Sequence, residues 1–131
     1  MFIYHRTIRV QDTDATGVLY FANQFQIALE AFEELLLTQG FSFGEMVRKN
    51  QFLLPIVHTE GDFFTPLTLG DQIEVHLSFS KIGTTSITHS SDIFKQGHRV
   101  GTTSIVHVAY CPNKEEAIPI PQELKKLITV R

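Results

Sequence analysis

The sequence predicts an α+β fold in which an antiparallel five-stranded sheet wraps around one long central helix. One observation behind this prediction is an amphipathic pattern over residues 21–37, where apolar side chains recur at the three- and four-residue steps that share one helix face. The other is a set of strand-like runs of about ten residues, one before the helix and four after it, separated by turn-forming breaks. A chain of 131 residues, 43% of them hydrophobic, is expected to form one domain over residues 1–131.

The chain begins with a predicted strand and the long helix. The strand covers residues 2–11, where the more apolar of two alternating faces consists of Phe2, Tyr4, Arg6, Ile8 and Val10. The helix is expected to start near Phe21 and to end before Gly40, because glycine is typical of the position after a helix. Its predicted core face consists of Phe21, Phe25, Ala28, Leu29, Phe32, Leu35 and Leu36. The mostly polar positions between them are assigned to the opposite face: Asn23, Gln24, Gln26, Glu30, Glu33 and Glu34.

The rest of the chain is expected to form a short helix, four strands and a last short helix. Ser42 is the expected cap of the short helix. The four strand-like runs cover residues 53–64, 72–82, 85–95 and 98–111. The breaks before the last two runs carry glycine and are short enough for hairpins. The second run alternates apolar and polar residues, which fits a sheet with one buried face. The last helix is predicted over residues 122–128.

Composition and charge exclude several classes of function. A net charge of -3 and a pI near 6.0 argue against nucleic-acid binding, which needs a concentrated positive surface. The single cysteine, Cys111, excludes an intrachain disulfide and is expected to be a packed thiol. The histidines lack the paired spacing of ligands on one helix, so no metal is expected. The sequence has neither a signal-peptide pattern nor about 18 consecutive apolar residues, so a cytoplasmic protein without a membrane partner is expected.

Two carboxylates and a glycine, Asp12, Asp14 and Gly17, occupy the connection between the first strand and the long helix. Aspartate and glycine favour turns for local reasons, so one interpretation is a capped strand-to-helix turn. The other interpretation is a catalytic carboxylate beside the positive end of a helix. The spacing of these residues alone does not choose between the two.

The segment QDTDATGVLYFANQF resembles the hotdog-fold thioesterases of the 4-hydroxybenzoyl-CoA thioesterase type. The resemblance is strongest at Asp12, Asp14, Gly17, Val18, Tyr20, Asn23 and Phe25, and it extends more loosely to Pro55, to Thr65-Pro66 and to KIGTTS at residues 81–86. Within that family the chain is most similar to the 1,4-dihydroxy-2-naphthoyl-CoA hydrolases of phylloquinone and menaquinone synthesis. The resemblance implies a hotdog fold and an enzyme that hydrolyses an acyl-CoA thioester without a metal or a bound cofactor. It also implies a homodimer or homotetramer with sites between subunits.

The resemblance further implies which residues act on the thioester. Asp14 matches the catalytic carboxylate of the family, as a nucleophile or as a general base. Asp12 is expected to stay nearer the turn and to accept backbone hydrogen bonds, as an Asx-type residue does. The backbone amide of Phe21, at the positive end of the helix, is expected to stabilise the oxyanion.

Contacts to the CoA and acyl parts of the substrate are expected from Lys81, Ser86, Tyr20 and His58. Lys81 fits the place where relatives hold CoA phosphates, and Ser86 lies near it in the sequence. Tyr20 belongs to the matching motif, whereas His58 follows Pro55 on a strand that could line the pocket. Further basic residues have no spacing that selects among them: Arg48, Lys49, Lys95, His98 and Arg99.

Several alternatives remain open at this point. The short-chain acyl-CoA thioesterases of the family have a histidine after the tyrosine of the motif, whereas this chain has Phe21. That aromatic ring either stacks on a flat aryl group or starts the core face of the helix. Another branch carries its carboxylate on the central helix, where Glu30, Glu33 and Glu34 would be the candidates. The alternative functions are a general short-chain or aryl acyl-CoA thioesterase and a non-catalytic acyl-binding module.

Overall fold

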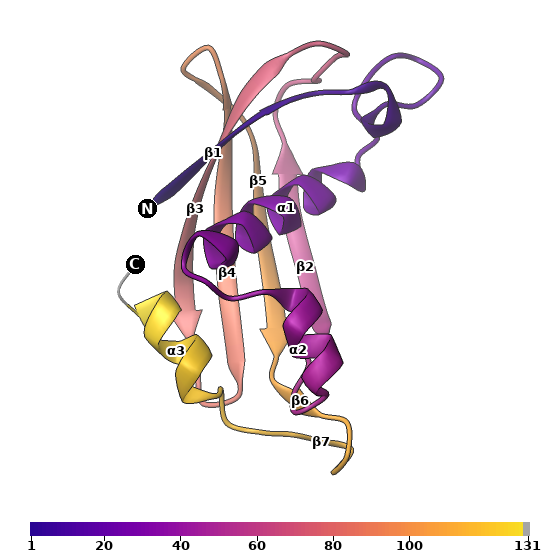
Figure 1. Cartoon of the computed structure of the whole chain (residues 1–131). Coiled ribbons are helices and arrows are strands. Elements are labelled where there is room, and N and C mark those ends of the chain that lie inside the picture. The colour runs from indigo at the N-terminus through magenta and orange to yellow at the C-terminus, as the bar shows by residue number, and fades with distance from the viewer. Residues whose placement is uncertain (130–131) are drawn as a thin grey trace.

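The computed structural model describes residues 1–129 and confirms the predicted α+β hotdog arrangement. One antiparallel sheet has the strand order β1-β3-β4-β5-β2, and the long helix α1 lies across one of its faces (Figure 1). The strands of this sheet are β1 (Phe2–Thr7), β2 (Ile56–Phe63), β3 (Gln72–Ile82), β4 (Ser86–Lys95) and β5 (His98–Val108). The helices are α1 (Asn23–Thr38), α2 (Phe43–Lys49), α3 (Gln122–Thr129) and the 3-10 helix η1 (Val10–Asp12). A small separate pair consists of β6 (Tyr110–Cys111) and β7 (Glu116–Ala117).

The strands after the helix lie close to the predicted ranges, although β2 begins only at Ile56 and the run at residues 98–111 divides into β5 and β6. The first strand is shorter than predicted. β1 ends at Thr7 instead of residue 11, because the carboxylate of Asp12 accepts the amide of Arg9 at 2.7 Å and the chain turns into η1. The hairpin between β4 and β5 turns at Gln96 and Gly97, with φ values of 50° and 79°. Left-handed angles at both positions are typical of two-residue hairpins. The pair β6 and β7 was not predicted.

The buried face of α1 differs from the predicted one at its first turn. Because the helix starts at Asn23, Phe21 lies in the preceding turn and is 59% exposed, so its assignment to the core face is wrong. Phe25 and Leu29 are only half-buried. Gln24, assigned to the polar face, is buried. The other buried residues of the helix are Ile27, Ala28, Ala31, Phe32, Leu35 and Leu36.

The predicted helix signals at Gly40 and Ser42 are confirmed. Gly40 has a φ of 86°, and the next amide, that of Phe41, donates to the carbonyl of Leu36 at 2.9 Å, which closes the end of α1. The hydroxyl of Ser42 accepts the amide of Glu45 at 3.2 Å and caps α2.

Beneath α1 the core contains a pair of histidines that the sequence did not predict. His89 of β4 and His107 of β5 are buried, and their Nε2 atoms are 3.0 Å apart. Because Nδ1 of His107 lies 3.0 Å from the carbonyl of Leu54, which can only accept, His107 carries its proton on Nδ1. His89 must therefore donate from Nε2, and Phe32 stacks on its ring with the centroids 4.4 Å apart. Burial, followed by the neighbouring histidine, lowers the pKa of His89 to about 3.

The histidine pair should make the fold sensitive to mild acid. In the unfolded chain His89 binds a proton near its ordinary pKa of 6.5, whereas in the folded chain it does so only near pH 3. The stability that the neutral His89 contributes is therefore fully present above pH 6.5 and is lost as the pH falls below that value. From His89 alone, the free energy of unfolding should drop by about 2 kcal/mol between pH 7 and pH 5. Urea unfolding at both pH values measures this.

The variant His89→Leu should show a pH dependence that is weaker by about the same amount. His98 is exposed on the rim of the sheet, so His98→Gln is the matched control and should keep the dependence of the parent. An equally steep loss of stability in His89→Leu would contradict the assignment.

Candidate active site

The connection between η1 and α1 is a small hairpin loop, which projects at the start of α1 in Figure 1. Thr13 and Leu19 pair across this loop. Its base closes where the amide of Tyr20 donates to the carbonyl of Asp12 at 3.0 Å. Asp14 and the start of α1 are therefore joined by one short, closed segment of chain.

Asp12 is the structurally engaged carboxylate of the pair. It is only 6% exposed, and its two oxygens accept hydrogen bonds from the guanidinium of Arg6 at 2.6 and 2.9 Å. The amide of Arg9 also donates to it, at 2.7 Å. The hydrogen bonds from Arg6, more than any other cause, hold the pKa of Asp12 below its usual range. The backbone hydrogen bond expected for Asp12 is present, and the ion pair with Arg6 adds a constraint that was not predicted.

Asp14 is exposed, and only one of its carboxylate oxygens is engaged. Oδ1 accepts the hydroxyl of Thr16 at 2.5 Å and the amide of the same residue at 2.8 Å. These bonds, the one from the hydroxyl first, hold the pKa of Asp14 below its usual range. Within the described part of the chain no group donates to Oδ2, so this oxygen can attack a carbonyl or take a proton from water. The Asx-type turn expected at Asp12 thus belongs to Asp14.

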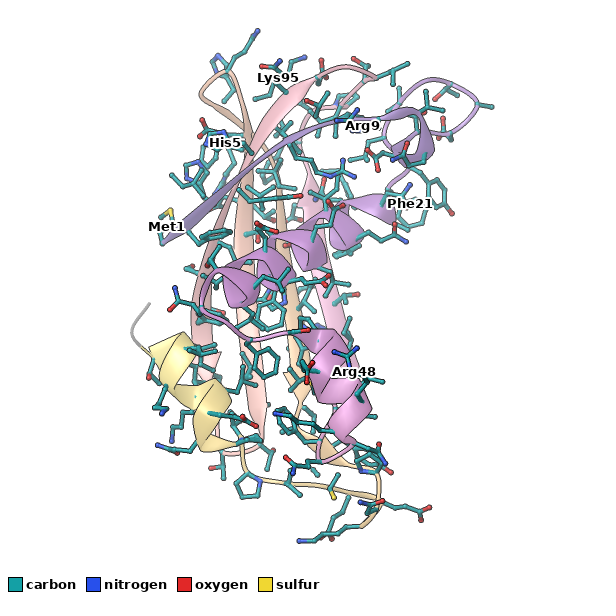
Figure 2. All side chains as sticks on the ribbon, in the orientation of Figure 1. Met1, His5, Arg9, Phe21, Arg48 and Lys95 are labelled. Atoms are coloured by element: carbon teal, nitrogen blue, oxygen red, sulfur yellow. The ribbon has the colours of Figure 1, made fainter. Side chains whose placement is uncertain are left out.

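The backbone amides just before α1 are unpaired. Among residues 1–129, Phe21 and Ala22 donate their amides to no acceptor, whereas the amide of Asn23 bonds to the carbonyl of Tyr20 at 2.8 Å. Because Ala22 is the N-cap of α1, the positive end of the helix dipole lies at these two amides. Figure 2 shows Phe21 at this end of the helix, and its ring meets that of Phe63 edge-on with centroids 6.3 Å apart.

Two side-chain amides fix the first turn of α1 on opposite sides. Nδ2 of Asn23 donates to the carbonyl of Asp12 at 2.9 Å, which ties the helix to the base of the loop. Nε2 of Gln24 donates to the carbonyls of Asp62 and Thr102 at 3.1 and 3.0 Å, which ties the helix to β2 and β5. The position of the free amides is therefore set by both the loop and the sheet.

A hollow of about 250 Å³ lies beside the start of α1. Val18, Leu19, Phe21 and Gln24 line it from the loop and the helix, and residues 63–67 line it from the end of β2 and the segment after it. Most of these side chains are apolar or aromatic, as expected for the binding site of a flat organic group.

Three predicted contact residues lie at the other end of the sheet. Through the strand pairing Phe63 is level with Val75 of β3, and Lys81 lies about 20 Å further along that strand at about 3.3 Å per residue. Ser86 begins β4 across the hairpin from Lys81. His58 is exposed near the start of β2, with Nε2 3.3 Å from a carboxylate oxygen. Within one chain, these three residues and the free amide of Phe21 do not come together.

Tyr20 is the one predicted contact residue beside Phe21, with ring centroids 4.9 Å apart. Of the helix carboxylates considered as alternative catalytic groups, Glu30 is already engaged, because it accepts hydrogen bonds from Nε of Arg6 at 3.1 Å. Glu30 therefore belongs to the network that holds Asp12. The other helix carboxylates considered are exposed: Glu33 and Glu34.

The family of this chain follows from its similarity to known proteins. The sequence matches the thioesterase-like superfamily over residues 8–128. The chain belongs to this superfamily. It is 36% identical to a 1,4-dihydroxy-2-naphthoyl-CoA hydrolase from Rippkaea orientalis, over 92% of this chain and 90% of that protein. It is 34% identical to a protein of the same name from Gloeothece citriformis, over 92% of this chain and 87% of the relative.

Solved structures agree with the membership of the superfamily. A 1,4-dihydroxy-2-naphthoyl-CoA thioesterase from Synechocystis superposes with a TM-score of 0.93 at 28% identity, covering 98% of this chain and 95% of the other. A gentisyl-coenzyme A thioesterase superposes with a TM-score of 0.84 at 26% identity, covering 94% and 98% of the two chains. The fold and the chain length of these thioesterases are thus shared.

Arg6 and Gln24 are residues of the candidate site that were not predicted from the sequence. Arg6 shares the inward face of β1 with Phe2 and Tyr4, and a charged group on such a face needs a partner. Gln24 lies four residues before the buried Ala28, on the core-facing stripe of the helix. The alternation of the strand and the periodicity of the helix place both residues on inward faces, but they do not indicate which groups these side chains bind.

Two expected absences concern a metal and a membrane span. No group of three or more His, Cys, Asp and Glu side chains among residues 1–129 could hold a metal ion. None of the helices in the same range combines the length and apolar character needed to cross a bilayer. The absence of a metal and of a membrane partner stays a prediction.

Replacing Thr16 with valine should raise the pKa of Asp14, because the strongest hydrogen bond to Oδ1 is lost and the backbone bond remains. If ionised Asp14 acts on the thioester, activity disappears as the pH falls through its pKa, so the acidic limb of kcat/KM should move to higher pH. Hydrolysis of an aryl-CoA thioester between about pH 3 and pH 8 measures the shift.

The matched control is Thr13→Val, because the hydroxyl of Thr13 donates to a backbone carbonyl instead of to Asp14. This control should keep the acidic limb of the parent. An unchanged limb in a folded Thr16→Val protein would show that Thr16 does not set the ionisation that limits activity.

Proposed function

We propose that this protein hydrolyses 1,4-dihydroxy-2-naphthoyl-CoA to 1,4-dihydroxy-2-naphthoate and CoA in phylloquinone or menaquinone biosynthesis. The relatives from Rippkaea orientalis and Gloeothece citriformis carry that activity in their names and align over nearly the whole chain. The solved structure from Synechocystis, a 1,4-dihydroxy-2-naphthoyl-CoA thioesterase, supports the same substrate. We place the protein in the cytoplasm and treat residues 1–131 as one domain.

The observation that carries the proposal is a free carboxylate oxygen and a free backbone amide joined by one closed loop. Oδ2 of Asp14 would act on the thioester, either as the nucleophile or as the base that activates water, because both mechanisms need the same carboxylate in the same place. The amide of Phe21 would donate to the oxyanion that forms at the carbonyl. Such a donor is typically worth about 3 kcal/mol of transition-state stabilisation.

The anionic CoA portion needs positive charge, and a second copy of the chain would supply it. β2 is an edge strand of the sheet, and its Val57 is 60% exposed, a feature that calls for cover. Antiparallel pairing of β2 with the same strand of a second copy would place the Phe63 end of one against the Ile56 end of the other. The partner's Lys81 would then lie at the same end of the joint sheet as Asp14, and the partner's Ser86 beside it.

A second candidate substrate class is the hydroxybenzoyl type of CoA thioester. The gentisyl-coenzyme A thioesterase superposes over 94% of this chain, and its acyl group is a single hydroxylated ring. The hollow beside α1 is about 250 Å³, below the about 300 Å³ at which ligand pockets usually begin, so it suits the aryl part of a thioester alone.

The variant Asp14→Asn should lose roughly 10²- to 10⁴-fold in kcat/KM with 1,4-dihydroxy-2-naphthoyl-CoA, because the amide is neither a nucleophile nor a base. The measurement compares this ester with a hydroxybenzoyl-CoA and a short aliphatic acyl-CoA. The parent should prefer the naphthoyl ester. Glu33→Gln removes an exposed carboxylate of α1 and should retain the activity of the parent.

Other outcomes identify the wrong part of the proposal. Preference for the aliphatic ester would contradict the assignment to quinone biosynthesis, but it would not contradict the proposed role of Asp14. Equal rates for the parent and Asp14→Asn would mean that another carboxylate acts. Binding of CoA without hydrolysis of any ester would favour a non-catalytic acyl-binding module.

The parent should have the mass of a dimer or tetramer of its 14.9 kDa chain in light scattering at micromolar concentration. Val57→Glu places a charge on the exposed edge of β2 and should shift the mass toward the monomer and lower the activity. Val47→Glu, at an equally exposed position on α2, is the control and should retain the mass of the parent. A monomeric parent would contradict the proposed assembly.

A further inference from the structure

Gln24 is a buried polar side chain in a mostly apolar hollow. It is only 2% exposed, and it lines the hollow whose other walls include Leu19, Phe21 and Phe63. A buried amide costs free energy unless its donors and its acceptor find partners. Both donors of Gln24 have protein partners, whereas its acceptor, Oε1, has none among the described residues and keeps contact with solvent, since it is not one of the fully buried atoms without a partner.

The orientation of the Gln24 amide follows from its partners. Nε2 faces the carbonyls of Asp62 and Thr102, at 3.1 and 3.0 Å, and both of these groups can only accept. The amide lies against Gly101, where a Cβ would come within 2.7 Å of Oε1 and 2.9 Å of Nε2. It is therefore held in one orientation by three neighbours. In the described part of the chain no group donates to Oε1.

The hollow adjoins the proposed oxyanion donor, because Phe21 both lines it and carries the free amide. An acyl group with its carbonyl oxygen at this amide would have its ring beside Val18, Phe63 and the segment after β2. The volume of about 250 Å³ suits a ring system and leaves the CoA portion outside.

We propose that Gln24 determines specificity by accepting, through Oε1, a hydrogen bond from a ring hydroxyl of the aryl acyl group. The inference rests on the proposed thioesterase function and adds the feature of the substrate that is recognised. A hydroxyl next to the thioester bonds internally to the carbonyl, so the hydroxyl remote from the thioester, the 4-hydroxyl of the naphthoyl ring, is the donor for Gln24. An acyl group without it would cover Oε1 without supplying a donor in place of solvent, which disfavours that substrate.

The test compares kcat/KM of the parent for 1,4-dihydroxy-2-naphthoyl-CoA and for 1-hydroxy-2-naphthoyl-CoA, which lacks only the remote hydroxyl. The parent should prefer the dihydroxy ester by about tenfold, the effect of one buried hydrogen bond. This comparison needs no variant and is therefore independent of any effect of mutation on folding.

The variant Gln24→Met has a similar length and no acceptor, so the preference should fall to about one. The variant also loses the bonds to β2 and β5 and should lower both rates, but a structural effect alone would leave their ratio unchanged. Asn23→Ala is the matched control, because it removes a side-chain amide from the same turn that bonds to Asp12 outside the hollow. It should lower both rates and keep the preference of the parent.

The outcomes separate this inference from the proposed function. A parent that hydrolyses both esters at equal rates would overturn the role of Gln24 and leave the thioesterase proposal standing. A preference that persists in Gln24→Met would also overturn it, because another group would then read the hydroxyl. A parent that hydrolyses neither ester would remove both proposals together.

Discussion

The ion pair between Arg6 and Asp12 is the constraint on which the geometry of the candidate site depends. The guanidinium of Arg6 binds Asp12 at the end of η1 and Glu30 in the middle of α1, so one side chain of β1 holds two other elements. The carbonyl of Asp12 in turn accepts from the backbone of Tyr20 and the side chain of Asn23. Breaking a buried pair of this kind typically costs about 3–5 kcal/mol, because one charge is left without a partner. The loop with Asp14 and the free amides thus extends from a rigid base.

Two aspartates separated by one residue have very different surroundings. Asp12 is buried, and both of its oxygens are engaged by Arg6, which suits anchoring and keeps the carboxylate away from solvent. Asp14 is exposed and held through Oδ1 by Thr16, which fixes its orientation and leaves Oδ2 free. Both carboxylates are stabilised in the ionised form, but of the two only Asp14 is exposed. The resemblance to the hotdog thioesterases separates the two residues in this way, whereas their spacing alone does not.

Much of the fold was predictable because local signals and global packing agree. The alternation in β3, the cap at Ser42 and the hairpin turn at Gln96 and Gly97 all act within a few residues, and each lies where it was expected. The candidate site depends on contacts between distant residues, which no local pattern contains. Gln24 was assigned to the polar face because it is polar. The two carbonyls that satisfy it inside the protein lie on β2 and β5, far away in the sequence. The resemblance of Lys81 to CoA-binding positions did not reveal that Lys81 lies far along the sheet from Phe63 of the same chain.

The contact between Gln24 and Gly101 restricts the routes by which this protein could evolve. The amide occupies the space that a Cβ at position 101 would fill, so a side chain there would push the end of Gln24 away from the carbonyls of Asp62 and Thr102. A lineage that first exchanged Gln24 for a small residue would accept alanine at position 101 without this displacement. Glutamine that later returned to position 24 would no longer fit its present position. The order of the two substitutions therefore decides whether the link between the helix and the two strands can be restored.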